Sequence, residues 1–279
     1  MSKITGAFDR FFKYVIHGVP TLNTNVTVSQ INYGGILKDK NILITGGSRG
    51  LGYAIAKKCI AEGAKVVITG RSIDTLITVQ NELGTDKCNV LEFDVRDVKL
   101  FADKIREAAN LLGGRIDCLV NNAGISIHGI NYKTCTEEDW DKQMDTNLKG
   151  IYFLTQEFIK HYHSVKNTSG NIIMMTSERG LYGDDVPYGI SKAGLISYTK
   201  GLSKKLILDG IRVNAVAPGV TATNMTNYDP NDNLYRKSAI GLRVLLPEEI
   251  AEVVTFLLSD ASKCVSGAVI NCNEANHLR

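Results

Sequence analysis

From about residue 41 onward, short apolar runs rich in Val and Ile alternate with longer segments of helical period. Two parallel strands need a crossover of helix length between them, so this alternation predicts repeated strand–helix–strand units. The predicted strands are Asn41–Thr45, Lys65–Thr69, Asn89–Phe93, Ile116–Asn121, Asn171–Thr176, Ile211–Ala217 and Ala268–Asn271. The expected fold class is α/β, a doubly wound parallel seven-stranded sheet with helices on both faces.

The composition is that of an ordinary globular protein, with 44% hydrophobic and 22% charged residues among 279. That length suits a single α/β domain, which we expect to span residues 41–279. A formal net charge of +3 without a local basic cluster does not favour nucleic-acid binding. Six cysteines without a CxxC pair indicate free thiols in a reducing cytoplasm. The lack of about 18 consecutive apolar residues argues against a membrane span, and the lack of an uninterrupted apolar core with a small-residue cleavage site at the N-terminus argues against secretion.

Residues 1–40 precede the first strand and are expected to form an amphipathic helix followed by an extended arm. The helix is predicted over Ser2–His17 and the arm over Thr21–Gln30, with Pro20 ending the helical pattern. The apolar positions of the helix are Ile4, Phe8, Phe11, Phe12 and Val15, and its basic positions are Lys3, Arg10 and Lys13. We expect the apolar face to pack on the same chain or a sister subunit; the alternative is a membrane-surface anchor.

A glycine-rich turn, Thr45–Gly52, directly follows the first strand and opens the helix predicted from about Gly50. Glycines there let the backbone turn tightly and approach a pyrophosphate at the helix N-terminus. The spacing Gly-x-x-x-Gly-x-Gly differs from the commonest dinucleotide motif, and a plain strand-to-helix turn is the alternative. The residues expected to bind a dinucleotide here are Gly46, Ser48, Arg49, Gly50, Leu51 and Gly52.

The end of the second predicted strand indicates which dinucleotide is bound. An NAD-preferring fold places an acid there to bind the ribose 2′-hydroxyl, whereas this chain has Arg71. A guanidinium can bind a 2′-phosphate through charge-assisted hydrogen bonds, so the sequence predicts NADP(H), with Arg49 as a second contact. The alternative is that both arginines are solvated surface charges. Asp94, after the third strand, is expected to accept from the adenine amino group or to cap the next helix.

Tyr188 and Lys192 form a Tyr-x-x-x-Lys pattern, which on a helix places both side chains on one face. Hydride attack on a ketone leaves an alkoxide, which requires a hydrogen-bond donor and then a proton. A Tyr phenol can supply both if a nearby ammonium and a cationic nicotinamide lower its pKa from near 10. Alone, the pattern also fits a packed Tyr and a solvated Lys on an ordinary helix.

Taken together, these motifs make the chain similar to the short-chain dehydrogenases/reductases, in their compact branch. The similarity runs from about Lys40 to Gly267 and rests on Thr45–Gly52, Asn121–Gly124, Asn147, Ser177, Tyr188, Lys192 and Pro218–Gly219. The resemblance implies a Rossmann-type fold and a nicotinamide-dependent oxidoreductase that acts on a carbonyl or secondary alcohol, most often as a homotetramer.

The resemblance also implies a role for each matching residue. Tyr188 would be the acid/base and Ser177 would bind the substrate oxygen, while Lys192 would bind the nicotinamide ribose and Asn147 would hold a water on a proton relay. Besides the glycine loop, Arg71 and Asp94, the implied cofactor-binding residues are Val95, Asn122, Ala123, Gly124, Tyr188, Lys192, Pro218 and Gly219.

The chain departs from the family pattern at two places. Only ten residues separate Ser177 from Tyr188, about two fewer than is usual, so the loop Glu178–Pro187 should form an altered pocket wall. Its acids, Asp184 and Asp185, are expected to be solvated, with contact to a polar substrate as the alternative. Near the C-terminus, an Asn-Glu-Ala run at 273–275 replaces the Asp-Gly-Gly of many relatives.

Other signals concern metals and the substrate loop. His161 and His163 lie on different faces of a predicted helix, and the run from Asp229 lacks the Gly and Glu of a calcium loop, so no metal site is expected. The stretch Thr221–Leu246 corresponds to the family's substrate loop and is long enough to act as a lid. Its candidate pocket residues, which can equally pack on one another as a flexible cover, are Met225, Tyr228, Leu234 and Tyr235.

The function expected from the sequence is NADP(H)-dependent hydride transfer between nicotinamide and a ketone or secondary alcohol, with a 3-oxoacyl thioester as the default substrate. The alternatives are a sugar or steroid alcohol dehydrogenase and a non-catalytic nucleotide-binding regulatory protein on the same fold. The expected partners are a small-molecule substrate and other copies of the chain, as a tetramer or dimer, without nucleic acid or membrane contact.

Overall fold

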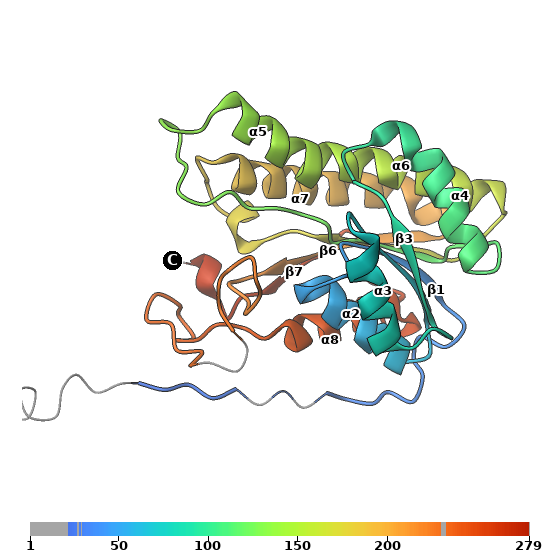
Figure 1. Cartoon of the computed structure of the whole chain (residues 1–279), viewed down its shortest axis with the longest axis horizontal. Helices are drawn as coiled ribbons and strands as arrows, with labels where there is room; N and C mark the ends of the chain where they lie inside the picture. Colours follow the sequence, from blue (N-terminus) through green and yellow to red (C-terminus); the bar gives the residue numbers. More distant parts are fainter. Residues whose placement is uncertain (1–21, 27, 29, 230–232, 279) are drawn as a thin grey trace, which may run out of the picture.

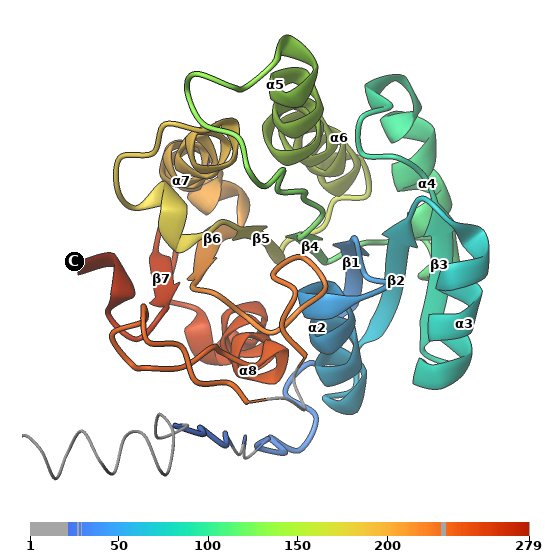
Figure 2. The same cartoon turned by 60° about the vertical axis from the view of Figure 1, so that its left-hand side comes forward.

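The computed structural model describes residues 22–26, 28, 30–229 and 233–278. Its seven strands form one parallel sheet in the order β3-β2-β1-β4-β5-β6-β7. The strands are β1 (Asn41–Thr45), β2 (Lys65–Gly70), β3 (Cys88–Glu92), β4 (Cys118–Asn121), β5 (Gly170–Met175), β6 (Ile211–Pro218) and β7 (Val269–Cys272). The predicted fold class is confirmed, and the strand order reverses direction between β1 and β4 (Figure 2).

Helices cover both faces of the sheet, with α4 to α7 on one side and α2 and α8 on the other (Figure 2). Their bounds are α2 (Gly50–Ala61), α3 (Ile73–Leu83), α4 (Phe101–Leu111), α5 (Glu137–Met144), α6 (Gly150–Ser164), α7 (Pro187–Leu206) and α8 (Pro247–Leu258). Local signals fix several starts: Ser72 caps α3, Thr136 forms a capping box with Asp139 at α5, and α7 and α8 each begin with a proline.

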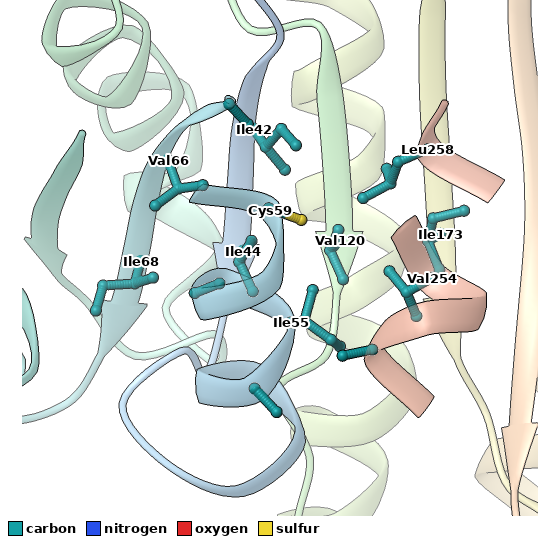
Figure 3. Close-up of a cluster of buried hydrophobic side chains, with 14 of the residues drawn as sticks. Ile42, Ile44, Ile55, Cys59, Val66, Ile68, Val120, Ile173, Val254 and Leu258 are labelled. Atoms are coloured by element: carbon teal, nitrogen blue, oxygen red, sulfur yellow. The ribbon is translucent and has the colours of Figure 1, made fainter. Parts of the chain in front are cut away.

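The sheet is apolar on both faces because successive side chains of each strand enter opposite layers. In β1, Ile42 and Ile44 pack with α2 and α8, whereas Leu43 joins the core beneath α4, α6 and α7. Figure 3 shows the first of these layers, where Ile55 of α2 and Val254 of α8 meet the strand side chains. This two-sided burial explains why the strands are near-continuous apolar runs in the sequence.

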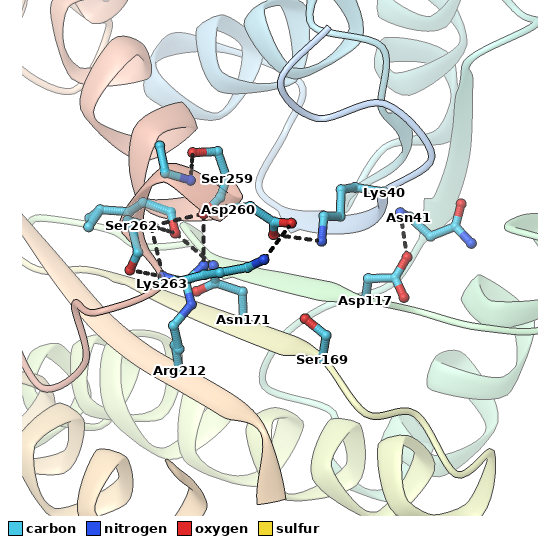
Figure 4. Close-up of polar contacts among 12 residues, drawn as sticks. Lys40, Asn41, Asp117, Ser169, Asn171, Arg212, Ser259, Asp260, Ser262 and Lys263 are labelled. Carbon is cyan, nitrogen blue, oxygen red and sulfur yellow. Dashed lines mark hydrogen bonds and ion pairs between the residues drawn. The ribbon is translucent and has the colours of Figure 1, made fainter.

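Polar side chains close the amino-terminal edge of the sheet (Figure 4). Arg212, at the start of β6, donates to the Ser259 and Ser262 carbonyl oxygens at 3.0 and 2.9 Å, and Asp117 accepts from the backbone N–H of Asn41 at 2.9 Å. Asn171 of β5 donates to the Leu257 carbonyl at 2.7 Å. These side chains therefore bind other parts of the fold, and the described candidate site residues lie at the opposite, carboxyl edge.

The N-terminal arm runs along α2 and α8 (Figure 1). The predicted helix Ser2–His17 lies outside the described residues. The described part of the arm predicted over Thr21–Gln30 has neither helix nor strand, and the Thr24 N–H donates to Asn233 Oδ1 of the substrate loop at 3.0 Å. Farther along, the buried Lys58 donates to the Ile31 carbonyl. Among the described residues, no helix is long and apolar enough to cross a membrane.

Candidate active site

Most of the predicted site residues stand at the carboxyl ends of six strands. The glycine loop follows β1, Arg71 follows β2, Asp94 follows β3, Asn122 follows β4, Ser177 follows β5 and Pro218 ends β6. In an open α/β sheet, ligands bind at this edge where the strand order reverses, here between β1 and β4. The fold therefore places the cofactor and catalytic motifs along one edge of the sheet.

The conformation of the glycine loop requires glycine. Gly46 and Gly50 have φ of 65° and 54°, in the left-handed region that side chains avoid. Gly52 faces the Gly46 carbonyl so closely that a Cβ at position 52 would overlap it. The turn thus brings its backbone against the start of α2, as a pyrophosphate-binding loop requires.

Two residues at the end of β1 and β4 hold the loop in place. The Thr45 hydroxyl accepts from the backbone N–H groups of Asn122 and Ala123, each at 3.0 Å. In return, Asn122 Nδ2 donates to the carbonyl oxygens of Thr45 and Gly46 at 2.9 and 3.0 Å. The segment Asn122–Gly124 is therefore attached to the glycine loop.

Arg49 and Arg71 are both exposed at the cofactor end, and within the described part of the chain neither side chain forms a hydrogen bond or ion pair. Both guanidiniums are available to an anionic ligand. Asp94 instead binds Arg96 through Nη2 at 2.6 Å, and this arginine holds the pKa of Asp94 below its ordinary value. A Cβ on Gly150 would overlap the Val95 carbonyl, so α6 packs on the backbone that follows Asp94.

Lys192 lies one turn beyond Tyr188 on α7, as predicted, but it is only 4% exposed. Its ammonium donates to the Met175 carbonyl at 2.9 Å and lies 5.7 Å from the centre of the Tyr188 ring. Burial lowers the pKa of Lys192 to about 8, because the charged form has lost its hydration. The alternative of a solvated lysine is wrong.

Tyr188 faces Ser177 across the active site. Burial raises the pKa of Tyr188 above its ordinary value, and the neighbouring Ser177 side chain opposes the rise. Ser177 Oγ also accepts from the backbone N–H of Arg179 at 3.3 Å. An oxygen acceptor placed between the two hydroxyls could receive a hydrogen bond from each.

Asn147 lies in a π-helical segment, Asp145–Lys149, between α5 and α6. Its side chain binds both backbone groups of Ile125 at 2.8 Å and approaches Ser191 Oγ at 3.4 Å. A Cβ at Gly124 would lie 3.3 Å from Asn147 Oδ1 and 3.4 Å from Lys192 Nζ. The structure therefore brings Asn147 and Lys192 to the same glycine, and π segments of this kind are frequent at functional sites.

The structure of the short loop Glu178–Pro187 differs from one expectation. Asp184 is not solvated, because its side chain is only 4% exposed and forms a bidentate ion pair with Arg179 at 2.5 and 2.6 Å. Asp185 is exposed, as expected, and accepts from the Tyr132 N–H at 3.3 Å. The loop therefore folds so that Asp184 binds Arg179 of the same loop. The sequence signal for this ion pair was the presence of two opposite charges five residues apart in a short loop.

Sequence reasoning also missed a contact between the active-site turn and the C-terminal tail. Glu178, next to Ser177, is buried and accepts from Asn276 Nδ2 at 2.9 Å. The tail reaches it because Glu274 and Ala275 adopt left-handed φ of 48° and 63°. Arg243 of the substrate loop donates to Glu274 at 2.7 Å. The tail therefore touches both the turn after Ser177 and the loop Thr221–Leu246.

The substrate loop packs largely on itself and on the arm. Leu234 is 2% exposed and lies in a small core with Ala222, Val244 and Leu246, against which Val26, Val28, Val220 and Tyr228 pack. Tyr235 pairs with Arg243 in an isolated bridge, and Met225 remains partly exposed. Leu234 and Tyr228 therefore pack within the loop as part of a cover, and they do not line an open pocket.

No group of three or more potential metal ligands occurs among the described residues. His163 is exposed and lies 3.6 Å from Asp209, whereas His161 is half-buried. All six cysteines are free, as expected: Cys59, Cys88 and Cys118 are buried, and Cys264 is exposed.

Comparisons with known proteins agree with this geometry. The family model for short chain dehydrogenases matches residues 40–233. The 3-oxoacyl-[acyl-carrier-protein] reductase FabG of Thermotoga maritima is 38% identical over 246 residues, covering 84% of this chain and 96% of the relative. The meso-2,3-butanediol dehydrogenase of Serratia marcescens is 32% identical over 237 residues, covering 83% and 92%. Among solved structures, an actinorhodin polyketide ketoreductase with NADPH is 28% identical, with a TM-score of 0.77 and coverage of 85% and 97%.

The chain belongs to the short-chain dehydrogenase/reductase family. It is an oxidoreductase that transfers a hydride between a nicotinamide cofactor and a carbonyl or CH–OH group of a small molecule. The predicted family, fold and reaction class are therefore confirmed.

Proposed function

We propose that Tyr188, Ser177, Lys192 and Asn147 are the catalytic residues of an NADP(H)-dependent ketone reductase. The observation that carries this proposal is the buried Lys192 ammonium, 5.7 Å from the centre of the Tyr188 ring, with the Ser177 side chain acting on the Tyr188 hydroxyl. The two hydroxyls can donate hydrogen bonds to a substrate oxygen, and the nearby ammonium stabilises the negative charge that forms as this oxygen changes from a carbonyl to an alkoxide.

In the reducing direction, Ser177 and Tyr188 donate hydrogen bonds to the carbonyl oxygen and polarise it. A bound nicotinamide supplies the hydride. Tyr188 then gives its proton to the alkoxide oxygen and becomes a phenolate, which the Lys192 ammonium stabilises. Asn147 holds the Ile125 backbone beside Lys192, where a relay through water can return a proton to Tyr188.

The cofactor-binding set is the glycine loop with Ser48, Arg49 and Leu51, the segment Asn122–Gly124, and the residues Arg71, Asp94, Val95, Pro218 and Gly219. The backbone cradle fits a pyrophosphate, because the positions closest to the turn have no room for a Cβ. The two unpaired guanidiniums and the lack of an acid at the end of β2 favour the 2′-phosphate of NADP(H).

We favour a 3-oxoacyl thioester as the substrate, because several similar proteins are named as 3-oxoacyl reductases. A small diol or sugar alcohol is the second candidate, since a butanediol dehydrogenase also matches over most of the chain. The loop acids add no support for it, because Asp184 is engaged by Arg179.

A homo-oligomer, a cytoplasmic location, and a division into residues 1–40 and a catalytic domain over 41–279 belong to the same proposal. Partly exposed aromatic side chains on α5 and α6, Trp140 and Tyr152, support association between copies.

A substrate panel tests the proposal. Purified full-length protein is assayed with NADPH and with NADH against acetoacetyl-coenzyme A, acetoin and simple ketones, and in reverse with 2,3-butanediol. We expect the highest kcat/KM for the thioester with NADPH. A preference for the diol pair would favour the second candidate, and no turnover with any compound would contradict the proposed substrate classes.

A further inference from the structure

The turn after Ser177 places an arginine beside the proposed catalytic tyrosine. Arg179 lies in the one-turn helix Glu178–Gly180, and its guanidinium carbon is 6.0 Å from the centre of the Tyr188 ring. The side chain is 40% exposed, so it stands at the edge of the site. A cation at this distance from an aromatic face is attracted to the ring.

Asp184 fixes the position of this guanidinium. Its two carboxylate oxygens accept from Arg179 Nε and Nη2, and Oδ1 also accepts from the Val186 N–H at 3.3 Å. The carboxylate can lie there because residue 189, in the first turn of α7, is glycine: a Cβ at that position would overlap Asp184. The shortened loop thus holds the Arg179 guanidinium through the Asp184 carboxylate.

Four charged groups act on Tyr188 from the elements around it. Lys192 is on its own helix, Arg179 and Glu178 come from the turn after β5, and Asp184 comes from the loop. The Glu178 carboxylate is directed toward the C-terminal tail, where Asn276 binds it. The two cations therefore favour a negative charge on the Tyr188 oxygen, and the two carboxylates oppose it.

The two cations differ in how long they keep their charge as pH rises. The pKa of Lys192 is lowered to about 8 by burial, so its ammonium begins to lose its proton in mildly alkaline solution. A guanidinium does not lose its proton in a protein. Well above pH 8, Arg179 is the cation that remains beside Tyr188.

We propose that Arg179 is a positioning residue for Tyr188, a second cation that stabilises the phenolate formed when the tyrosine gives up its proton, and that Asp184 sets the strength of this effect. This inference rests on the proposed acid/base role of Tyr188. In the reduction, the Tyr188 proton moves to the alkoxide oxygen and the negative charge that remains on the phenol faces Arg179 and Lys192. In the oxidation, the same charge must be present before the alcohol can lose its proton.

A matched set of charge variants tests the proposal. Arg179→Gln removes the cation, Asp184→Asn removes its partner while keeping the shape, and Asp185→Asn is the control at the neighbouring exposed acid. The readout is the titration of Tyr188, taken as the difference in phenolate absorbance between each protein and the same protein carrying Tyr188→Phe. The pH profile of kcat for alcohol oxidation provides a second readout.

We expect Arg179→Gln to raise the titration midpoint of Tyr188 by about one pH unit and Asp184→Asn to lower it. Arg179→Lys should restore part of the shift, and Asp185→Asn should leave the midpoint unchanged. Shifts in the same direction for Arg179→Gln and Asp184→Asn, or none in either, would overturn the inference. Full activity of Tyr188→Phe would instead overturn the proposed function, so the two failures are distinguishable.

Discussion

Thr45 and Asn122 bind one another in both directions across the carboxyl ends of β1 and β4. The threonine hydroxyl accepts from the Asn122 backbone N–H at 3.0 Å, and Asn122 Nδ2 donates to the Thr45 carbonyl at 2.9 Å. Thr45 is 1% exposed, so water cannot replace these partners. The glycine loop is thereby fixed before any dinucleotide binds.

Replacing the Thr45 hydroxyl should loosen the loop. Thr45→Val keeps the shape but leaves the N–H groups of Asn122 and Ala123 without their acceptor, at a cost of about 1–3 kcal/mol for each buried group. We expect a lower free energy of unfolding in urea and a cofactor Kd raised about tenfold or more. Thr45→Ser retains the hydroxyl and should behave nearly as wild type; equal losses in both variants would contradict this explanation.

Arg71 should determine the preference for NADP(H). Its guanidinium is exposed at the end of β2 and free to bind a 2′-phosphate, so Arg71→Ala should weaken NADP⁺ binding about tenfold or more and leave NAD⁺ binding little changed. Titration calorimetry with both oxidised cofactors measures this. Arg106→Ala, which removes the same charge from the surface of α4, is the control. Tighter binding of NAD⁺ than NADP⁺ by the wild type would contradict the assignment.

The buried Lys192 should reduce stability in the absence of added cofactor. Its pKa is about 8 in the folded protein against 10.5 ordinarily, so the unfolded chain binds more protons between these values and wild-type stability rises with pH across that window. Below pH 8 the penalty is full, about 3 kcal/mol. Lys192→Met should therefore be more stable than wild type at pH 7. Loss of the hydrogen bond to the Met175 carbonyl makes this gain smaller than the full penalty. The difference in stability should shrink toward pH 10.5.

Urea unfolding at fixed protein concentration over this pH range measures the Lys192 effect. Lys200→Met, at an exposed position on the same helix, should give a difference from wild type that does not change with pH in this way. A Lys192→Met protein that is less stable than wild type at every pH would show that the lysine stabilises the fold.

The sequence predicted the sheet and the motif positions well because both depend on local pattern. β1 has the predicted bounds, Asn41–Thr45, since burial on both faces makes the strand a continuous apolar run between polar residues. Tyr188 and Lys192 share one helix, where a spacing of four residues fixes their relative placement.

The sequence could not predict interactions that depend on where loops and the tail return to the fold. The burial of Asp184 depends on its close approach to Gly189, and this approach follows from where α7 begins in the folded chain. The bond from Asn276 to Glu178 joins residues 98 positions apart. It also depends on left-handed backbone at Glu274 and Ala275, which neither residue type would suggest.

The central claim is that Tyr188 transfers the proton in the reduction. The most direct measurement compares the kcat and NADPH affinity of wild type, Tyr188→Phe and Tyr182→Phe, the last removing a hydroxyl from an exposed tyrosine of the neighbouring loop. We predict that Tyr188→Phe lowers kcat about 100-fold or more while NADPH affinity stays within a few-fold, and that Tyr182→Phe changes neither. A Tyr188→Phe enzyme that retains more than about a tenth of wild-type kcat would contradict the claim.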